Sequence, residues 1–167
     1  MKRFVIFRHA KSSWDKRGRA DHDRPLADRG RRDGPRMGER LARRGIKPDL
    51  LLVSSAKRAR ETAELIEPAL KHASLAQVID PDIYLASSGK LIEILKTVSD
   101  DVDELLLIGH NPGLTQLANQ LLPEFRLHNL PTAGAVAIES EAERWRYLDT
   151  TGLHLRFYDY PKNPDPV

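Results

Sequence analysis

The stretch FVIFRHAK, residues 4–11, decides the fold prediction, because a short apolar run stops abruptly at an arginine and a histidine. Continuous runs of Val, Ile and Phe are typical of strands that are buried on both faces of a parallel sheet. In open α/β sheets, ligands bind beyond the carboxyl ends of the strands. The stretch therefore predicts a first strand that delivers Arg8 and His9 to the rim of such a sheet. An arginine fork suits phosphate, and a histidine nitrogen can attack or exchange a proton near neutral pH.

Two later segments repeat this arrangement of a buried strand followed by a helix. The runs LLLV at 50–53 and ELLLI at 104–108 each lead into polar residues and then into apolar residues at helical spacing. We expect helices from about 56 to 72, capped by Ser54 or Ser55, and from Pro112 to about 122, capped by Asn111. Arg58 falls in the first turn of the earlier helix, where the helix dipole disfavours a cation unless an anion binds there. Lys57 and Arg60 are alternative candidates for the residue that binds this anion.

The remaining patterns complete an α/β prediction. A short strand is expected at 76–79, a helix capped by Ser87 or Ser88 follows it, and three short strands at 135–139, 145–148 and 153–158 have no helices between them. These last strands are expected to add antiparallel edges. We predict a three-layer α/β/α fold with a mostly parallel sheet, formed by a single domain over residues 1–160. Residues 161–167 are expected to be a disordered tail.

Two polar segments lie between the first and second strands. Residues 12–24 are expected to form a long loop pinned to the body by Trp14, and its Asp21-His22-Asp23 run favours a solvated loop over a metal cluster. Residues 29–45 predict an amphipathic helix with Pro35 in its first turn. The polar face of this helix carries a stripe of arginines: Arg29, Arg31, Arg32, Arg36, Arg40, Arg43 and Arg44. A solvated helix face is favoured over a docking surface for an acidic partner.

Composition limits the possible classes of protein. The chain has 167 residues, a formal net charge of +3 and no cysteine, which removes disulfides, cysteine nucleophiles and thiolate metal sites. No apolar run approaches the ~20 residues that a membrane span needs, and no secretory signal follows Met1. We expect a cytoplasmic protein without membrane contact, and the positive charge favours anionic partners.

The three turns should bring Arg8, His9, Arg58 and His110 to one rim of the sheet. Two guanidinium groups and two imidazoles make a cationic pocket that fits a tetrahedral dianion such as a phosphoryl group. Because the chain has no cysteine and no G-x-S-x-G segment, His9 is the best candidate for a nucleophile.

These segments resemble the motifs of the histidine phosphatase superfamily, which includes cofactor-dependent phosphoglycerate mutases. Arg8-His9-Ala10 is similar to that family's Arg-His-Gly signature, with alanine in place of the glycine, and the segments at 54–62 and 107–112 are similar to its second and third motifs. Arg24-Pro25-Leu26 with Gly30 is similar to a further motif that recurs in this family. The matches run in family order from residue 3 to about 115, and the short chain most resembles SixA-type phosphohistidine phosphatases, which lack a long capping insertion.

The resemblance implies a phosphoglycerate mutase-like fold, His9 as the phosphorylated nucleophile, and Arg8, Arg58 and His110 as ligands of the phosphoryl group. It implies no metal and no cofactor. For the general acid, Asp82 is the positional candidate and Asp15 a weaker one, although the interpretation of Asp82 as a turn residue beside Pro81 is favoured slightly.

We therefore expect a metal-independent phosphatase that acts on phosphohistidine in proteins, and that is a monomer. A small-molecule phosphomonoesterase is the enzymatic alternative. A non-catalytic module that binds phosphoproteins or nucleic acid through the arginine stripe is the alternative from another class, and the nucleic acid is the less expected partner.

Overall fold

The computed structural model describes residues 1–14 and 17–164. Its strands are β1 (Lys2–Arg8), β2 (Leu50–Ser54), β3 (Ala76–Asp80), β4 (Glu104–Gly109), β5 (Ala135–Ser140) and β6 (Leu153–Asp159). Its α-helices are α1 (Asp28–Arg43), α2 (Lys57–Leu70), α3 (Ser88–Lys96) and α4 (Gly113–Leu121). Three short 3₁₀ helices are η1 (Asp21–Asp23), η2 (Pro81–Ile83) and η3 (Trp145–Tyr147).

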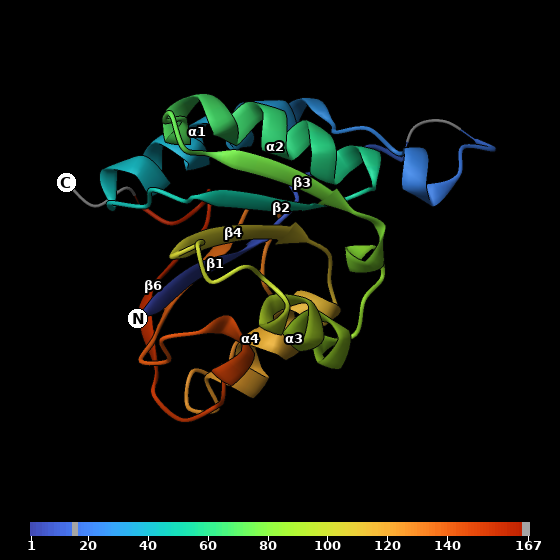
Figure 1. The fold of residues 1–167 in the computed structure, drawn as a ribbon. Helices are drawn as coiled ribbons and strands as arrows, with labels where there is room; N and C mark the ends of the chain where they lie inside the picture. The colour runs from blue at the N-terminus through green and yellow to red at the C-terminus, as the bar shows by residue number, and fades with distance from the viewer. Residues whose placement is uncertain (15–16, 165–167) are drawn as a thin grey trace.

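The strands form one six-stranded sheet in the order β3-β2-β4-β1-β5-β6. The first four strands in this order run parallel, and β5 is antiparallel to both of its neighbours. Figure 1 shows α1 and α2 over one face of the sheet, and α3 and α4 over the other. The predicted α/β class and the antiparallel addition at the end of the chain are confirmed. The antiparallel strand β5 lies inside the sheet, and β6 forms the edge.

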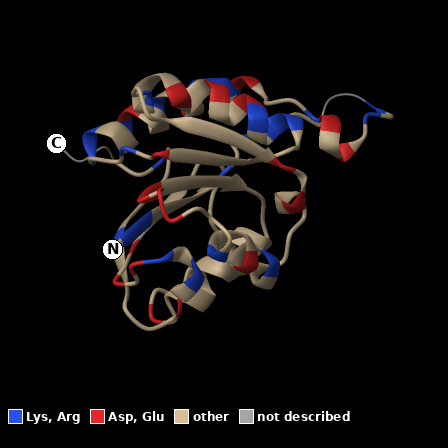
Figure 2. Ribbon diagram, in the orientation of Figure 1, with Lys and Arg blue, Asp and Glu red and all other residues tan. Residues whose placement is uncertain are grey.

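Alternation along β1 explains why the sheet can bury both faces. Phe4 and Ile6 belong to the core beneath α3 and α4, whereas Val5 and Phe7 belong to the core beneath α1 and α2. All four side chains are fully buried. Charged residues lie mainly on the helices and loops, and the central strands are almost free of them (Figure 2). The two cores place β1 near the centre of the molecule, so its carboxyl end is held rigidly.

The helix α1 differs from the prediction at its proline. The helix begins at Asp28, so Pro35 lies in its interior instead of its first turn. The helix tolerates this proline because α1 packs tightly against α2. A Cβ added at Gly34 or Gly38 would lie within 3.0 Å of Leu65 or Ile66 of α2. The small residues let α1 approach α2 closely, and the buried contact offsets the hydrogen bond that proline cannot make.

The arginine stripe is also not uniformly solvated, which corrects the prediction for part of it. Arg40 is 1% exposed and forms a two-pronged ion pair with the fully buried Asp159, at 2.5 and 3.1 Å. Arg44 donates to the same carboxylate at 3.2 Å and its guanidinium lies over the ring of Phe157. These two arginines tie α1 to the end of β6, so they are structural cations and less available to a partner.

Three local predictions were wrong. The segment from Trp145 forms η3 instead of a strand, because its buried residues Trp145 and Leu148 are three apart, which suits a 3₁₀ turn. Neither Ser54 nor Ser55 caps α2, whose N-cap position is occupied by Ala56. The helix α4 begins at Gly113, with Pro112 at its N-cap position, slightly later than expected.

The first residues of the expected tail pack against the body. Pro161 is buried, and the Asn163 side-chain amide donates to Asp159 at 3.0 Å while the Asn163 carbonyl accepts from Arg40 at 3.0 Å. The Arg40–Asp159 pair therefore also anchors the turn after β6. Residues 165–167 lie outside the described residues.

Candidate active site

The carboxyl ends of β1, β2 and β4 meet at one rim of the sheet and supply the predicted residues. Register pairs Arg8 with Gly109, so His9 and His110 follow neighbouring strands at the same level. Their ring centroids lie 5.2 Å apart. Arg58 comes from the first turn of α2 and its Nε lies 3.4 Å from His9 Nε2. The structure thus brings together Arg8, His9, Arg58 and His110, as the sequence predicted.

The hydrogen bonds of His9 determine which ring nitrogen carries the proton and which carries the lone pair. His9 Nδ1 lies 2.8 Å from the Ala10 carbonyl oxygen, which can only accept, so the neutral ring carries its proton on Nδ1. The lone pair is then on Nε2, which faces Arg58. Burial, followed by the nearby His110 and the two arginines, lowers the pKa of His9 well below its ordinary value. The Nε2 lone pair of this neutral ring accepts from the Arg58 Nε–H at 3.4 Å, and it is the electron pair that a nucleophile requires.

His110 is held by a buried serine. Its Nε2 lies 2.7 Å from Ser54 Oγ, and Ser54 is fully buried at the end of β2. When the Ser54 hydroxyl donates to Nε2, the His110 proton resides on Nδ1, which is buried and has no partner. Burial and the charge of Arg58 lower the pKa of His110 to about 3, so this ring is neutral near pH 7.

The segment around Ala10 tolerates alanine without strain. Ala10 is fully buried, and its backbone does not adopt the left-handed conformation that would favour glycine. Its N–H donates to Thr62 Oγ1 at 3.0 Å, and the Thr62 hydroxyl donates to the Arg58 carbonyl at 2.7 Å. Thr62 therefore couples the position of the nucleophile segment to that of α2.

Asp21 is an unexpected part of the site. Arg58 donates to the Asp21 carbonyl at 2.8 Å and to its carboxylate at 3.0 Å. The same carboxylate accepts from Tyr84 at 2.5 Å and from Arg24 at 2.8 Å. The Tyr84 hydrogen bond and the two arginines hold the pKa of Asp21 well below its ordinary value. Asp21 is 43% exposed, as expected of a solvated segment, but its part in the site was not predicted: η1 folds back over α2, and the carboxylate fixes the orientation of Arg58.

Tyr84 closes the pocket on the other side. Its ring stands edge-on to His110 at 5.5 Å and to His22 at 4.8 Å. Burial and the hydrogen bond to Asp21 raise the pKa of the Tyr84 hydroxyl, so this group remains a donor. Sequence reasoning missed Asp21, Ser54 and Tyr84 as site residues, because each acts through a contact with a residue that is distant in sequence.

The structure does not bring Asp82 into the pocket. Its backbone N–H donates to the Asp80 side chain within η2, the following Ile83 is buried in the core, and the Asp82 side chain is exposed. This turn directs Tyr84 into the pocket instead, so the positional argument for Asp82 as the general acid was wrong. Asp15, the weaker candidate, lies outside the described residues.

The pocket has a volume of about 460 Å³ and is open to solvent on one side. Its lining includes Trp14 and Leu85, whose side chains are 74% and 69% exposed. Trp14 does not pin the loop to the body as predicted, because it stands outward with the Arg24 guanidinium 3.2 Å from its ring centroid. The lining of the pocket therefore includes two large apolar side chains that are exposed.

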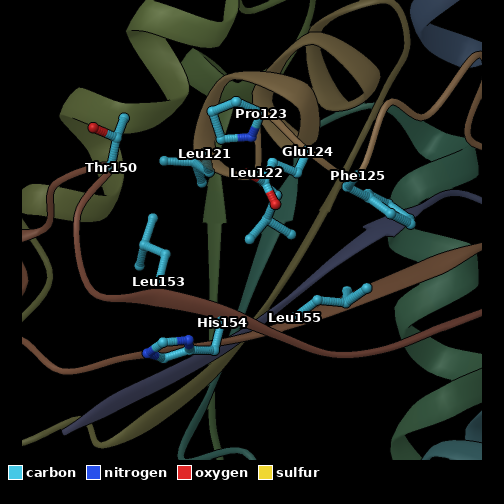
Figure 3. Close-up of a pocket in the computed structure, with 9 residues that line it drawn as sticks. All are labelled: Leu121, Leu122, Pro123, Glu124, Phe125, Thr150, Leu153, His154 and Leu155. Carbon is cyan, nitrogen blue, oxygen red and sulfur yellow. The ribbon is translucent and has the colours of Figure 1, made fainter.

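A larger hollow of about 730 Å³ lies elsewhere (Figure 3). It is lined by the loop after α4 and the start of β6, which the strand register places at the opposite end of the sheet from His9. Its one histidine, His154, is exposed and lies near Glu141. This hollow contains none of the predicted site residues.

Comparison with known proteins agrees with the geometry. The family model described as the histidine phosphatase superfamily (branch 1) matches residues 4–84. An uncharacterized protein of Mycobacterium tuberculosis is 39% identical over 166 residues, which cover 93% of this chain and 99% of that protein. The chain belongs to the histidine phosphatase superfamily.

Solved structures of this superfamily share the fold. The protein histidine phosphatase SixA in complex with tungstate has a TM-score of 0.78 at 22% identity, covering 95% of this chain and 97% of that one. A mycobacterial glucosyl-3-phosphoglycerate phosphatase has a TM-score of 0.69 at 15% identity, covering 96% of this chain and all of that one. Both confirm the phosphoglycerate mutase-like architecture. No helix within residues 1–14 and 17–164 is both long and apolar enough to cross a membrane.

Proposed function

We propose that this histidine phosphatase superfamily member removes phosphate from phosphohistidine on proteins, through a phosphorylated His9. One observation supports the chemistry above all others. Among residues 1–14 and 17–164, the buried nitrogens Arg8 Nε and His110 Nδ1 have no hydrogen-bond partner, and both residues line the same pocket as His9. Buried donors without partners are costly in a folded protein, and a phosphoryl oxygen would satisfy them.

In the first step, His9 Nε2 forms a bond to phosphorus as the bond between phosphorus and the substrate nitrogen breaks. The electron pair of that bond goes to the leaving imidazole, which keeps or takes up a proton from solvent. Arg8, Arg58 and His110 stabilise the charge on the equatorial oxygens. The Nδ1–H bond to the Ala10 carbonyl stabilises the positive ring of phosphorylated His9. In the second step, water attacks phosphorus, inorganic phosphate leaves and His9 recovers its lone pair.

The leaving group supports phosphohistidine as the substrate. Among the described residues, Asp21 is the one carboxylate that lines the pocket, and its ion pairs keep it deprotonated. A deprotonated carboxylate cannot supply a proton to an alkoxide, which is a poor leaving group. An imidazole leaves more readily, so a phosphohistidine substrate needs less help from an acid.

The rim supports a protein as the carrier of that group. Trp14 and Leu85 are large exposed apolar residues beside the pocket mouth, and such residues mark sites of contact with other proteins when they gather at one place. Leu85 also adopts a left-handed backbone conformation with φ of 56°, which is unfavourable for a leucine. The strained backbone holds the leucine outward, where a protein surface would cover it.

A small-molecule phosphomonoesterase is the second candidate. It is favoured by the fold shared with the mycobacterial sugar-phosphate phosphatase and by a pocket volume that would admit a small phosphoester. The two candidates share the His9 chemistry and differ only in what carries the phosphoryl group.

The test measures phosphate release, without added metal, from a phosphohistidine-bearing protein and from an aryl phosphate. His9→Ala should abolish release, whereas His128→Ala, which changes an exposed histidine outside the pocket, should leave it unchanged. Turnover of the phosphoprotein by wild type and His128→Ala alone would support the proposal. Activity on the aryl phosphate alone would select the small-molecule function. Equal turnover by His9→Ala would refute the assigned nucleophile.

A further inference from the structure

A hollow other than the one in Figure 3 adjoins the phosphate pocket. It has a volume of about 360 Å³, and Arg8, Lys11 and Thr132 line both cavities. Its other lining residues are Arg29, Asp33, Asn129, Pro131, Tyr160, Pro161 and Lys162. A group bound in this hollow would therefore lie beside the reacting phosphoryl group, with Arg8 between the two.

The charges of this hollow favour an anion. Lys11, Arg29 and Lys162 line it together with Arg8, against a single carboxylate from Asp33. Arg29 is only loosely held, because its Nε lies 3.9 Å from Asp33 and its terminal nitrogen lies 3.5 Å from Thr132 Oγ1. Within residues 1–14 and 17–164, the side chains of Lys11 and Lys162 make neither a hydrogen bond nor an ion pair. Three cations thus retain donors that a ligand can use.

The cations are brought together by tertiary structure. Lys11 follows β1, Arg29 lies in the first turn of α1, and Lys162 lies in the turn after β6. That turn is anchored, because Asp159 accepts from the Tyr160 N–H at 2.9 Å and from Arg40. Asn163 closes the turn by donating its N–H to the Tyr160 carbonyl at 3.0 Å. The hollow is therefore held in place by the buried Arg40–Asp159 pair.

We infer that this hollow is a specificity subsite for a carboxylate side chain that lies next to the phosphohistidine of the protein substrate. The inference rests on the proposed function and adds the chemistry of the neighbouring residue. A carboxylate carried on methylene groups suits the site better than a second phosphoryl group, because apolar side chains line the hollow beside its cations. Pro131, Pro161 and the Tyr160 ring supply apolar surface for the methylene groups of a glutamate.

The experiment compares two phosphohistidine peptides that differ only in a flanking glutamate or glutamine. Wild type should hydrolyse the glutamate peptide with a kcat/KM about 3- to 10-fold higher, which is the range for a few partly exposed ion pairs. The double variant Arg29→Gln/Lys162→Gln should lose this preference. Arg32→Gln/Arg36→Gln is the matched control, because it removes two charges from exposed positions of α1 that do not line the hollow. High salt should reduce the wild-type preference.

Each outcome separates the subsite from the proposed function. Equal hydrolysis of both peptides by wild type would overturn the subsite and leave the proposed function intact. Hydrolysis of phosphoramidate but of neither peptide would overturn both. The subsite would be overturned if the double variant still preferred the glutamate peptide. It would also be overturned if the double variant lost as much kcat/KM on phosphoramidate as on the glutamate peptide. Strong inhibition by pyrophosphate that disappears in the double variant would reassign the hollow to a second phosphoryl group.

Discussion

Replacing Gly30 with alanine should damage the active site from a position that touches no substrate. Gly30 lies in the first turn of α1, and an added Cβ would lie 2.2 Å from the carbonyl oxygen of Lys11 and 3.0 Å from its nitrogen. Lys11 is two residues after the proposed nucleophile. The neighbouring backbone is tightly tied, because the Lys11 carbonyl accepts from the Ala27 N–H at 2.9 Å. The strain therefore has no flexible side chain to absorb it.

The magnitude follows from this distance. Opening the contact from 2.2 Å to a tolerable 3.0 Å requires a backbone shift of roughly 0.8 Å. Overpacking of this kind costs about 1–3 kcal/mol, and the better helix propensity of alanine offsets up to ~1 kcal/mol of it. A displacement near 1 Å at a reacting group can reduce the rate by ~100-fold. We expect kcat/KM to fall by about 10- to 100-fold, with about 1–2 kcal/mol lost from the free energy of unfolding.

The assay is kcat/KM on phosphoramidate together with urea denaturation, and Gly34→Ala is the control. At Gly34 the added Cβ would lie 2.9 Å from the Cβ and Cδ1 atoms of Leu65, so this variant should also lose stability, but the contact lies between α1 and α2 and does not involve residues 9–11. Gly34→Ala should keep kcat/KM within about twofold of wild type, since no active-site backbone moves. Wild-type activity and stability in Gly30→Ala would refute the argument that this close approach holds the nucleophile segment.

Three further outcomes test the electrostatics. The lowered pKa keeps His9 neutral as the pH falls, so kcat/KM should drop less than about threefold between pH 8 and pH 5. A histidine with an ordinary pKa would give a drop of roughly 30-fold over the same range. A drop of about 30-fold that arises from titration of the enzyme would contradict this prediction. Ser54→Ala should lower kcat/KM by about 10-fold, since it removes the hydrogen bond to His110 Nε2, and unchanged kinetics would exclude Ser54 as a positioning residue. Arg40→Met should cost about 3–5 kcal/mol in urea denaturation, because it removes the two-pronged ion pair from the buried Asp159. A loss below ~1 kcal/mol would show that Arg44, Asn163 and the Tyr160 N–H compensate this carboxylate without Arg40.

The sequence alone determined the residues whose position follows from local rules. A buried strand must end somewhere, and parallel strands place their carboxyl ends on one rim, so Arg8, His9 and His110 could be placed together before any coordinates. Arg58 followed from its place in the first turn of a helix at that rim. The same local rules placed the core strands at residues 50–53 and 104–108, each one residue shorter than the observed β2 and β4.

Only the tertiary structure decided the features that depend on contacts between distant residues. Asp21 appeared to be a solvated loop residue because its partners Arg58 and Tyr84 lie 37 and 63 positions away. Arg40 appeared to be one exposed arginine among seven because Asp159 lies 119 positions away. Periodicity reports which side of an element is buried, but it does not report which charges meet across the fold. The phosphate pocket could thus be predicted from the sequence. The network that orients Arg58 and the cationic hollow proposed as a subsite exist only because α1, η1 and the turn after β6 pack around the same strand end.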